Sequence, residues 1–423
     1  MEKKFYGWTL LVVMFAIYFI SAIVTYGGSI AATHMASISD MSRTWFGAGY
    51  TVNFIAAGFG GTVAAIVARF IGERNVMIMG MSITAVGCVF MQLAGDNRFV
   101  FVAMFGVVVG GGATFATVVP IQTMITRWFV KRRALATGLV LTSGGLGGSL
   151  GSILANQIIE GSGGNWQRVW MWWAVFSVVA ALIAWRWVKN TPQDVGQMPD
   201  GEAALDESEA ALGDGPVVRN PNVYQTAYDW PLMEALRHRV IWHIVIIAIF
   251  SSAATFMVLT HGVIHLMDTG IDSTTAALSF SLLTFSSIGG RLISGVLGDR
   301  FEPRYLLALA VAIKTIGILL ILQADSTAGV YAYGLLTGLG FGMSLVAQFT
   351  LIGNYFGPTY IQNILAFILP ITTIGGAMAP LVGGILHDAT GSYHSAFLAA
   401  ASCAAVATIG ILLLRPVEKD PAL

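Results

Sequence analysis

Residues 8–32 read WTLLVVMFAIYFISAIVTYGGSIAA, twenty-five residues without one Asp, Glu, Lys or Arg. A transmembrane helix needs about 20 largely apolar residues to cross the hydrocarbon core of a bilayer. The short basic start before this run is also found in signal peptides. Because the run is long enough to span and similar runs follow it, we expect a first helix that is retained in the protein.

Eleven further apolar runs follow along the chain, and together with the first they predict an all-α membrane protein of twelve transmembrane helices. These runs cover residues 45–68, 76–94, 99–125, 134–158, 169–188, 240–264, 276–298, 305–322, 330–351, 361–385 and 395–414. Hydrophobic residues make up 56% of the chain and charged residues 10%. Soluble domains carry roughly 25% charged residues, so this composition excludes an ordinary soluble fold.

A polar segment divides the runs six and six. We expect residues 1–188 to form an N-terminal six-helix bundle, residues 189–239 a solvated cytoplasmic linker, and residues 240–423 a C-terminal bundle. Glycine clusters recur in the fourth run (residues 110–112) and the tenth (residues 338–342). Repeated helix bundles are usual in secondary transporters, with the solute site between the repeats. We therefore expect two bundles related by a pseudo-two-fold axis.

The distribution of charge predicts the orientation in the membrane. With both termini inside, most of the 22 Lys and Arg residues fall in inner segments, and only Arg43, Arg98 and Arg168 fall in outer ones. This bias follows the positive-inside rule, so we expect a multi-pass protein of the cell (inner) membrane with both termini cytoplasmic. The formal net charge of zero argues against nucleic acid as a partner.

The loop after the eighth run contains GVLGDRFEPR at residues 295–304, which resembles the acidic–basic loop motif of the major facilitator superfamily. Asp299, Arg300 and Arg304 are its charged positions. A degraded copy after the second run keeps Arg69 and Arg74. The resemblance implies a charge latch at the helix ends that holds one conformation; the alternative is ordinary loop charges.

Within that superfamily the chain resembles the branch of monocarboxylate porters and oxalate–formate exchangers. Four stretches carry the resemblance, namely FYGW at residues 5–8, RWFVKRRALATGLVLTSGG at 127–145, HGVIHLMDTGI at 261–271 and FSSIGGRLISGVLGDR at 285–300. The resemblance implies a carrier that moves a small lactate- or pyruvate-like anion by alternating access, coupled to protons. It also implies that Arg291 binds the substrate carboxylate.

Arg291 is the central candidate from the residues alone. It lies inside an apolar run between glycines, and a charge at that depth costs at least ~2.5 kcal/mol. A guanidinium stays protonated and matches the fork of a carboxylate, so we expect Arg291 to face a wet cavity and bind an anion. The alternative is a structural Arg bonded to helix carbonyls.

The proton-carrying group is harder to assign. Proton-coupled members of the branch carry an Asp four positions before the Arg, where this chain has Ser287. His261, at the outer end of the seventh run, titrates near neutral pH when unperturbed. Either His261 or the substrate carboxyl itself must then carry the proton, unless His261 is simply a solvated residue at a helix end.

Other side chains are candidates for the walls of the substrate cavity, although packing is an equally simple role for them: Thr117, Phe341, Tyr331, Leu146, Tyr50 and Asn53. Lys314, inside the ninth run, is either a second anion contact or, as we favour, a Lys bonded to polar atoms of a neighbouring helix. The remaining outer histidines read as loop residues: His34, His265, His387 and His394.

Several function classes find no support in the sequence. No Walker-type phosphate loop occurs, so ATP drive is not expected, and no cluster of Cys and His has metal-ligand spacing. We therefore expect no enzyme activity, cofactor or metal, and a carrier that works as a monomer with a small organic anion. Two alternatives stay open: an exchanger of another small organic anion (a dicarboxylate or a sulfonate), and a membrane sensor that binds its ligand without moving it.

Overall fold

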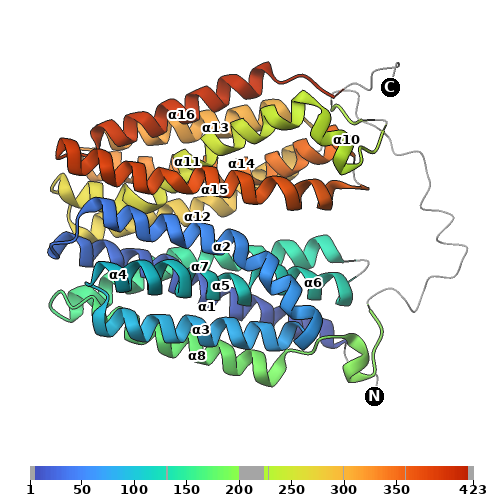
Figure 1. The fold of residues 1–423 in the computed structure, drawn as a ribbon, viewed down its shortest axis with the longest axis horizontal. Helices are drawn as coiled ribbons and strands as arrows, with labels where there is room; N and C mark the ends of the chain where they lie inside the picture. The colour runs from blue at the N-terminus through green and yellow to red at the C-terminus, as the bar shows by residue number, and fades with distance from the viewer. Residues whose placement is uncertain are drawn as a thin grey trace, which may run out of the picture. The chain divides into compact units, whose positions relative to one another are not determined.

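The computed structural model describes residues 5–129, 132–199, 223–226, 228–298, 300–357 and 359–417 (Figure 1). In these ranges twelve helical spans are long and apolar enough to cross a membrane, which confirms the predicted all-α membrane fold. The spans are α1 (Tyr6–Ile38), α2 (Arg43–Ile71), α3 (Glu73–Ala94), a fourth span from Arg98 to Trp128, α7 (Arg133–Gly161), α8 (Gln167–Trp187), α11 (Arg239–Asp268), α12 (Ser273–Gly298), α13 (Pro303–Ile321), α14 (Thr327–Phe356), α15 (Ile361–Thr390) and α16 (His394–Leu413).

The chain divides into two compact units. The first contains Met1–Met35 and Ala56–Val218, and the second contains Ala36–Ile55 and Arg219–Leu423. The end of α1 and the first part of α2 thus belong to the second unit. Within the predicted linker, the structure describes a 3-10 helix, η2 (Pro192–Val195), and a short helix, α10 (Leu232–Arg237), whereas residues 200–222 lie outside the described part of the chain.

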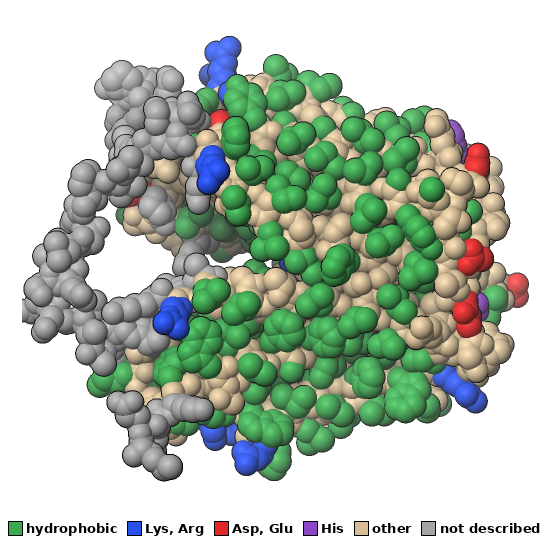
Figure 2. All heavy atoms as spheres, turned by 180° about the vertical axis from the view of Figure 1, so that it is seen from behind, with side chains coloured by type: hydrophobic (Ala, Val, Ile, Leu, Met, Phe, Trp, Pro, Cys, Tyr) green, Lys and Arg blue, Asp and Glu red, His purple; other side chains and the backbone are tan. Residues whose placement is uncertain are grey.

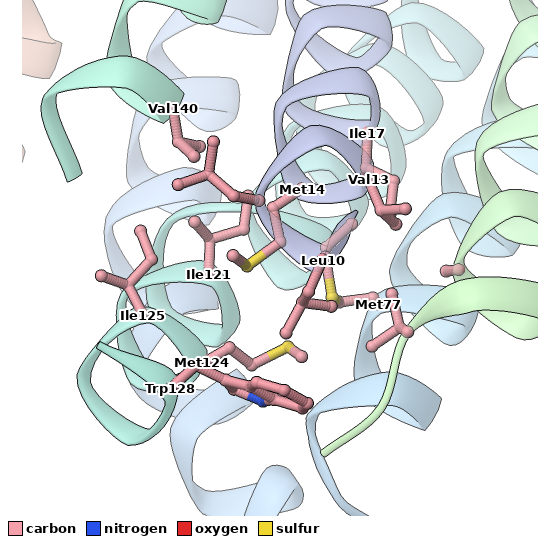
Figure 3. Close-up of a cluster of buried hydrophobic side chains, with 14 of the residues drawn as sticks. Leu10, Val13, Met14, Ile17, Met77, Ile121, Met124, Ile125, Trp128 and Val140 are labelled. Carbon is pink, nitrogen blue, oxygen red and sulfur yellow. The ribbon is translucent and has the colours of Figure 1, made fainter. Parts of the chain in front are cut away.

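A buried apolar cluster holds the first unit together (Figure 3). It joins Leu10 and Met14 of α1 to Met77 of α3 and to Trp128 at the end of the fourth span. These four side chains are fully buried. In a bilayer, close van der Waals packing rather than exclusion of water drives helices together, so this interlocked contact is what fixes α1, α3 and the fourth span.

In the second unit, glycines allow α12 and α14 to pack backbone against backbone. A Cβ at Gly338 would collide with the carbonyl oxygen of Leu283, and one at Gly342 would collide with that of Ser287. Gly290 of α12 meets the backbone of Leu339 in the same way. Small residues at such a contact are the usual means of close approach between membrane helices. This contact fixes the helix that carries Arg291.

The fourth span is not the continuous α-helix that the run 99–125 predicts. It consists of α4 (Arg98–Val100), a π-helical stretch η1 (Phe101–Val109), α5 (Gly110–Ala116) and α6 (Val118–Trp128). The break lies at Thr117, whose φ and ψ are −118° and −89°. Pro120 follows it and has no N–H to donate back to the carbonyl of Ala116, so the helical ladder is interrupted at this point.

Candidate functional site

Arg291 lies on a polar stripe of α12. Thr284, Ser287, Arg291 and Ser294 follow one another at spacings of three and four residues, which places them on one face of the helix. The Ser287 hydroxyl donates to the carbonyl of Thr284 at 2.6 Å. The Ser294 hydroxyl is buried without a hydrogen-bond partner among the described residues. The stripe therefore combines one permanent cation with hydroxyl groups. Arg291 itself lies seven residues before the end of α12.

Two predicted wall residues lie on α14, which packs on that helix. Phe341 is the neighbour of Gly342, whose backbone meets Ser287 one turn before Arg291. Tyr331 lies ten residues earlier on α14, about 15 Å along the helix axis. Both side chains are partly exposed. The structure therefore places Phe341 at the level of Arg291 and Tyr331 well away from it along α14.

His261 is buried and fully hydrogen-bonded, not the solvated residue that one sequence interpretation allows. Its Nε2 lies 2.8 Å from the carbonyl oxygen of Pro380, and its Nδ1 lies 3.0 Å from the hydroxyl of Tyr393. A carbonyl oxygen only accepts, so Nε2 must donate; the neutral ring then accepts from Tyr393 at Nδ1. Burial raises the pKa of the Tyr393 phenol above its usual range, which keeps this donor protonated.

Tyr50 and Asn53 lie on the part of α2 that belongs to the second unit. Both are buried. The ring of Phe46 lies 5.0 Å from the ring of Tyr50 and 5.7 Å from the ring of His261, between centroids. The Thr51 hydroxyl donates to the carbonyl of Ala377 on α15 at 2.7 Å. The structure thus brings Tyr50 and His261 together through Phe46, on helices far apart in sequence.

A charged cluster caps this region at the helix ends. The Arg43 guanidinium lies 3.0 Å from a carboxylate oxygen of Asp268, at the end of α11. The two oxygens of Asp388 accept the backbone N–H groups of Arg43 and Thr44 at 3.0 and 2.9 Å. A carboxylate at a helix N-terminus satisfies free N–H groups and favours the helix dipole. Asp388 of α15 therefore caps α2.

The expectation that four histidines are loop residues is wrong. His34 lies in α1, His265 in α11 and His387 in α15, and His394 begins α16. The His387 ring lies between two carboxylates: its Nε2 is 3.8 Å from an oxygen of Asp268, and its Nδ1 is 3.7 Å from an oxygen of Asp388. The helices continue past the apolar runs by several residues, which is why polar residues at their ends read as loops.

Thr117 and Leu146 belong to the first unit. Thr117 is buried at the break in the fourth span, and its hydroxyl donates to the carbonyl of Ala113 at 2.8 Å. Leu146 is a half-buried residue of α7. Their position relative to Arg291 stays a prediction.

The predicted latch residues of the second unit are only partly described, because Asp299 lies outside the described ranges. Arg304 donates to the carbonyl of Leu414 and, at 2.8 Å, to the hydroxyl of Tyr305, and Arg300 is exposed. Glu302, which lies inside the motif but is not one of its charged positions, accepts from Tyr355 at 3.2 Å. These contacts tie the ends of α13, α14 and α16 together.

In the first unit, Arg69 is exposed in the last turn of α2. Arg74 donates to the carbonyl of Trp185 and, through its backbone, to the side chain of Asn190. Glu73, next to this copy of the motif, pairs with Arg127 at 2.6 Å. Glu73 stands five positions after Ala68, the position where the motif has its Asp, so the motif itself does not point to this carboxylate.

Lys314 is fully buried, and its geometry favours the structural interpretation. The Nζ donates to the carbonyl and hydroxyl oxygens of Ser251 at 3.0 and 2.8 Å, and to the hydroxyl of Thr255 at 2.9 Å. Three protons thus meet three neutral acceptors on α11. Within the described residues, no group of three or more His, Cys, Asp or Glu side chains could hold a metal ion.

Comparison with known proteins finds membrane transporters that are similar to this chain in sequence and in fold. Monocarboxylate transporter 13 of Bos taurus is 25% identical over 360 residues, covering 85% of this chain and 77% of that protein. The gentisate transporter of Corynebacterium glutamicum is 24% identical over 396 residues, covering 90% and 83%. A crystal structure of a D-xylose–proton symporter has a TM-score of 0.72 at 14% identity, covering 98% of each chain.

The family model described as Major Facilitator Superfamily matches residues 14–369 and 268–423. These matches together extend over most of the sequence, and the relatives and the fold neighbours are membrane transporters rather than enzymes. The twelve-span all-α fold agrees with them. This chain therefore belongs to the major facilitator superfamily and is a secondary transporter.

Proposed function

We propose that the protein carries a small monocarboxylate, of the size of lactate or pyruvate, across the membrane by alternating access. The observation that carries the proposal is Arg291, a permanent cation inside a membrane span on a stripe of hydroxyl groups. Ionisable residues at such depth mark substrate pathways. The guanidinium can replace the hydration that a carboxylate loses on leaving water.

The charge balance favours one carboxylate over two. Among the described residues of the second unit, the other Lys or Arg in the interior of a span is Lys314, whose three protons are already held by Ser251 and Thr255. The stretch FILPITTIGG at residues 367–376 in α15 contains no Lys or Arg. Phe341 and Leu146 are proposed as apolar walls that limit the size of the acid.

The named relatives are consistent with this substrate class. Monocarboxylate transporters are named for the acids that they carry, and gentisate, the substrate in the name of another relative, is itself a carboxylate. We propose that Asp299, Arg300, Arg304, Arg69 and Arg74 hold one conformation at the helix ends. We further propose that the carrier lies in the inner membrane with both termini cytoplasmic.

Proton coupling through His261 of α11 is proposed together with an alternative that Ser287 of α12 favours. His261 can gain a proton at Nδ1 if the Tyr393 hydroxyl turns from donor to acceptor. Ser287, however, occupies the position one turn before Arg291 where an acid would relay protons. That difference favours, as the second candidate function, exchange of one small organic anion for another without a proton.

A counterflow assay in proteoliposomes tests the proposal. Vesicles are loaded with an unlabelled acid, and uptake of trace labelled acid is followed for lactate, pyruvate, oxalate, gentisate and a small sulfonate. We expect counterflow with monocarboxylates and little with oxalate. Counterflow with oxalate alone would contradict the proposed substrate class. Uptake driven by a pH gradient in vesicles without internal acid distinguishes symport from exchange.

A further inference from the structure

A long groove in the first unit runs along the seam between α3 and α8. Its volume is about 1020 Å³. The lining is apolar apart from Ser82, and includes Ile78, Val86 and Phe90 of α3 and Val175, Leu182 and Trp185 of α8. Trp185 and Leu182 are more than half exposed, at 59% and 55%. The proposed substrate site does not use this groove, and the proposed latch residue Arg74 lies at its rim, where it donates to the carbonyl of Trp185.

The length of the groove matches one leaflet of a bilayer. Arg74, at the start of α3, donates to the carbonyl of Trp185, near the end of α8, so the two helices run antiparallel here. From Ile78 to Phe90 the lining spans twelve residues of helix, about 18 Å. The hydrocarbon core is about 30 Å thick, so the groove can hold one acyl chain from one leaflet.

Cations stand at one end of this groove. The Arg74 guanidinium contacts the rim of the groove, because it donates to the carbonyl of the lining residue Trp185. Arg186 and Lys189 follow Trp185 in the chain. Arg186 is exposed. The Nε of Arg74 is buried without a hydrogen-bond partner among the described residues. On the face drawn in Figure 2, hydrophobic side chains cover the helix flanks.

Nearby carboxylates in the described residues do not cancel these cations. Glu73 is paired with Arg127 at 2.6 Å. Asp194 accepts from the backbone and hydroxyl of Thr191 at 3.1 and 2.9 Å and keeps its negative charge, but the three cations Arg74, Arg186 and Lys189 outnumber it. The end of the groove at Trp185 therefore keeps a net positive charge, next to a long apolar channel.

We propose that the groove binds an anionic phospholipid. The acyl chain lies between α3 and α8, and the phosphate is held by Arg186 and Lys189 with Arg74 behind them. Basic pockets at the ends of transmembrane helices recognise anionic headgroups, and a Trp at the membrane interface suits the boundary between chain and headgroup. The site selects a lipid by the negative charge of its headgroup and the length of its acyl chain. Binding of the lipid does not depend on the transported solute.

Native mass spectrometry of delipidated protein, titrated with dioleoyl phosphatidylglycerol or dioleoyl phosphatidylcholine, tests the site. We expect the first bound phosphatidylglycerol to bind at least fivefold more tightly than phosphatidylcholine. The double variant Arg186→Ala/Lys189→Ala should lose about tenfold or more in phosphatidylglycerol affinity, because each cation near an anionic headgroup contributes about 1 kcal/mol. Arg168→Ala, at the opposite end of α8, is the matched control and should keep wild-type binding.

A second variant tests the groove itself. Val178→Trp fills the channel and should weaken the first phosphatidylglycerol at least fivefold, in protein whose melting temperature stays within a few degrees of wild type. Equal affinity for the two lipids, or unchanged selectivity in Arg186→Ala/Lys189→Ala, would overturn the proposal. So would a lipid-free dimer that cross-links through Val178→Cys, because a second copy would then fill the groove. Arg186 is exposed in the last turn of α8 and Lys189 lies just beyond the end of that helix, so the charge variants test the site even if Val178→Trp does not fold.

Discussion

The hydroxyl of Tyr393 lies 3.0 Å from Nδ1 of His261, and it links the residue that precedes α16 to α11. The other ring nitrogen is held by the carbonyl of Pro380 at 2.8 Å. The imidazole is therefore fixed in orientation and in tautomer by two groups on different segments. Such a ring can bind or release a proton only if its partners rearrange, which couples protonation to the packing of α11 and α15.

The first prediction concerns the pH dependence of uptake. If His261 carries the coupled proton, His261→Gln should flatten the profile, so that the ratio of uptake at about pH 6 to that at about pH 8 falls toward one. Glutamine keeps hydrogen-bonding capacity but cannot titrate. Initial rates in proteoliposomes across this range measure the effect.

His265→Gln is the matched control, since His265 is also a buried histidine and lies one turn further along α11. It should leave the profile unchanged. A His261→Gln variant that transports with the wild-type pH profile would remove His261 from the proton path and favour exchange.

The second prediction concerns the cap of α2. Asp388→Ala leaves the N–H groups of Arg43 and Thr44 without their acceptor, and loss of such a cap costs about 0.5–2 kcal/mol. We expect the melting temperature in detergent to fall by a few degrees. Asp388→Asn, which still offers an oxygen, should lose less. A variant Asp388→Ala as stable as wild type would show that this long-range cap contributes nothing to the fold.

The third prediction concerns Lys314. Lys314→Met keeps the length of the side chain while removing a buried charge and three hydrogen bonds. The acceptors left behind are neutral, and the Thr255 hydroxyl still donates to the carbonyl of Ser251 at 3.0 Å. We expect a folded protein with a modest loss of thermal stability and uptake of at least half the wild-type rate. Lys314→Glu places an anion among oxygen atoms and should fail to fold. A stable Lys314→Met protein without any uptake would assign Lys314 a role in transport.

The fourth prediction concerns topology. In a background with Cys88 and Cys403 replaced by Ala, a cysteine at Gly213 in the predicted linker should be protected from an impermeant maleimide in intact cells. A cysteine at Gly163, between α7 and α8, should be labelled. Labelling at Gly213 with protection at Gly163 would invert the orientation drawn from the Lys and Arg distribution.

Much of the architecture could be predicted because lipid imposes a simple rule: each span must be a long apolar helix. Residues 8–32 and the eleven other runs each correspond to a helical span. The interruption at Thr117 could not be read from hydropathy, because Pro120 changes backbone geometry without changing apolarity. The predicted run 99–125 is apolar throughout, and yet it folds into four helical pieces.

The sequence predicts the part of the site that depends on a single residue whose charge is costly to place inside a membrane span. It does not predict the parts in which residues distant in sequence meet. Arg291 is conspicuous because an ionised side chain inside an apolar run costs free energy and usually marks a functional site. The cap of α2 joins Asp388 to Arg43 across 345 positions, and nothing local to either residue signals it. The partners of Lys314 on α11 are hidden for the same reason, since Ser251 and Thr255 are ordinary polar residues of a membrane helix.

Binding of the transported acid to Arg291 variants tests the central claim most directly. Charge-assisted hydrogen bonds contribute about 1.5–3 kcal/mol each, which corresponds to roughly ten- to hundredfold in affinity. The measurement is the rise in melting temperature of purified protein when the acid identified by counterflow is added, since a ligand of the native state stabilises it. Arg291→Ala should lose this rise, and Arg291→Lys should keep little of it because the planar fork is gone. Arg168→Ala, an exposed residue at the start of α8, should keep all of it. Full stabilisation of a folded Arg291→Ala protein by the acid would contradict the account, because the anion site would then lie elsewhere.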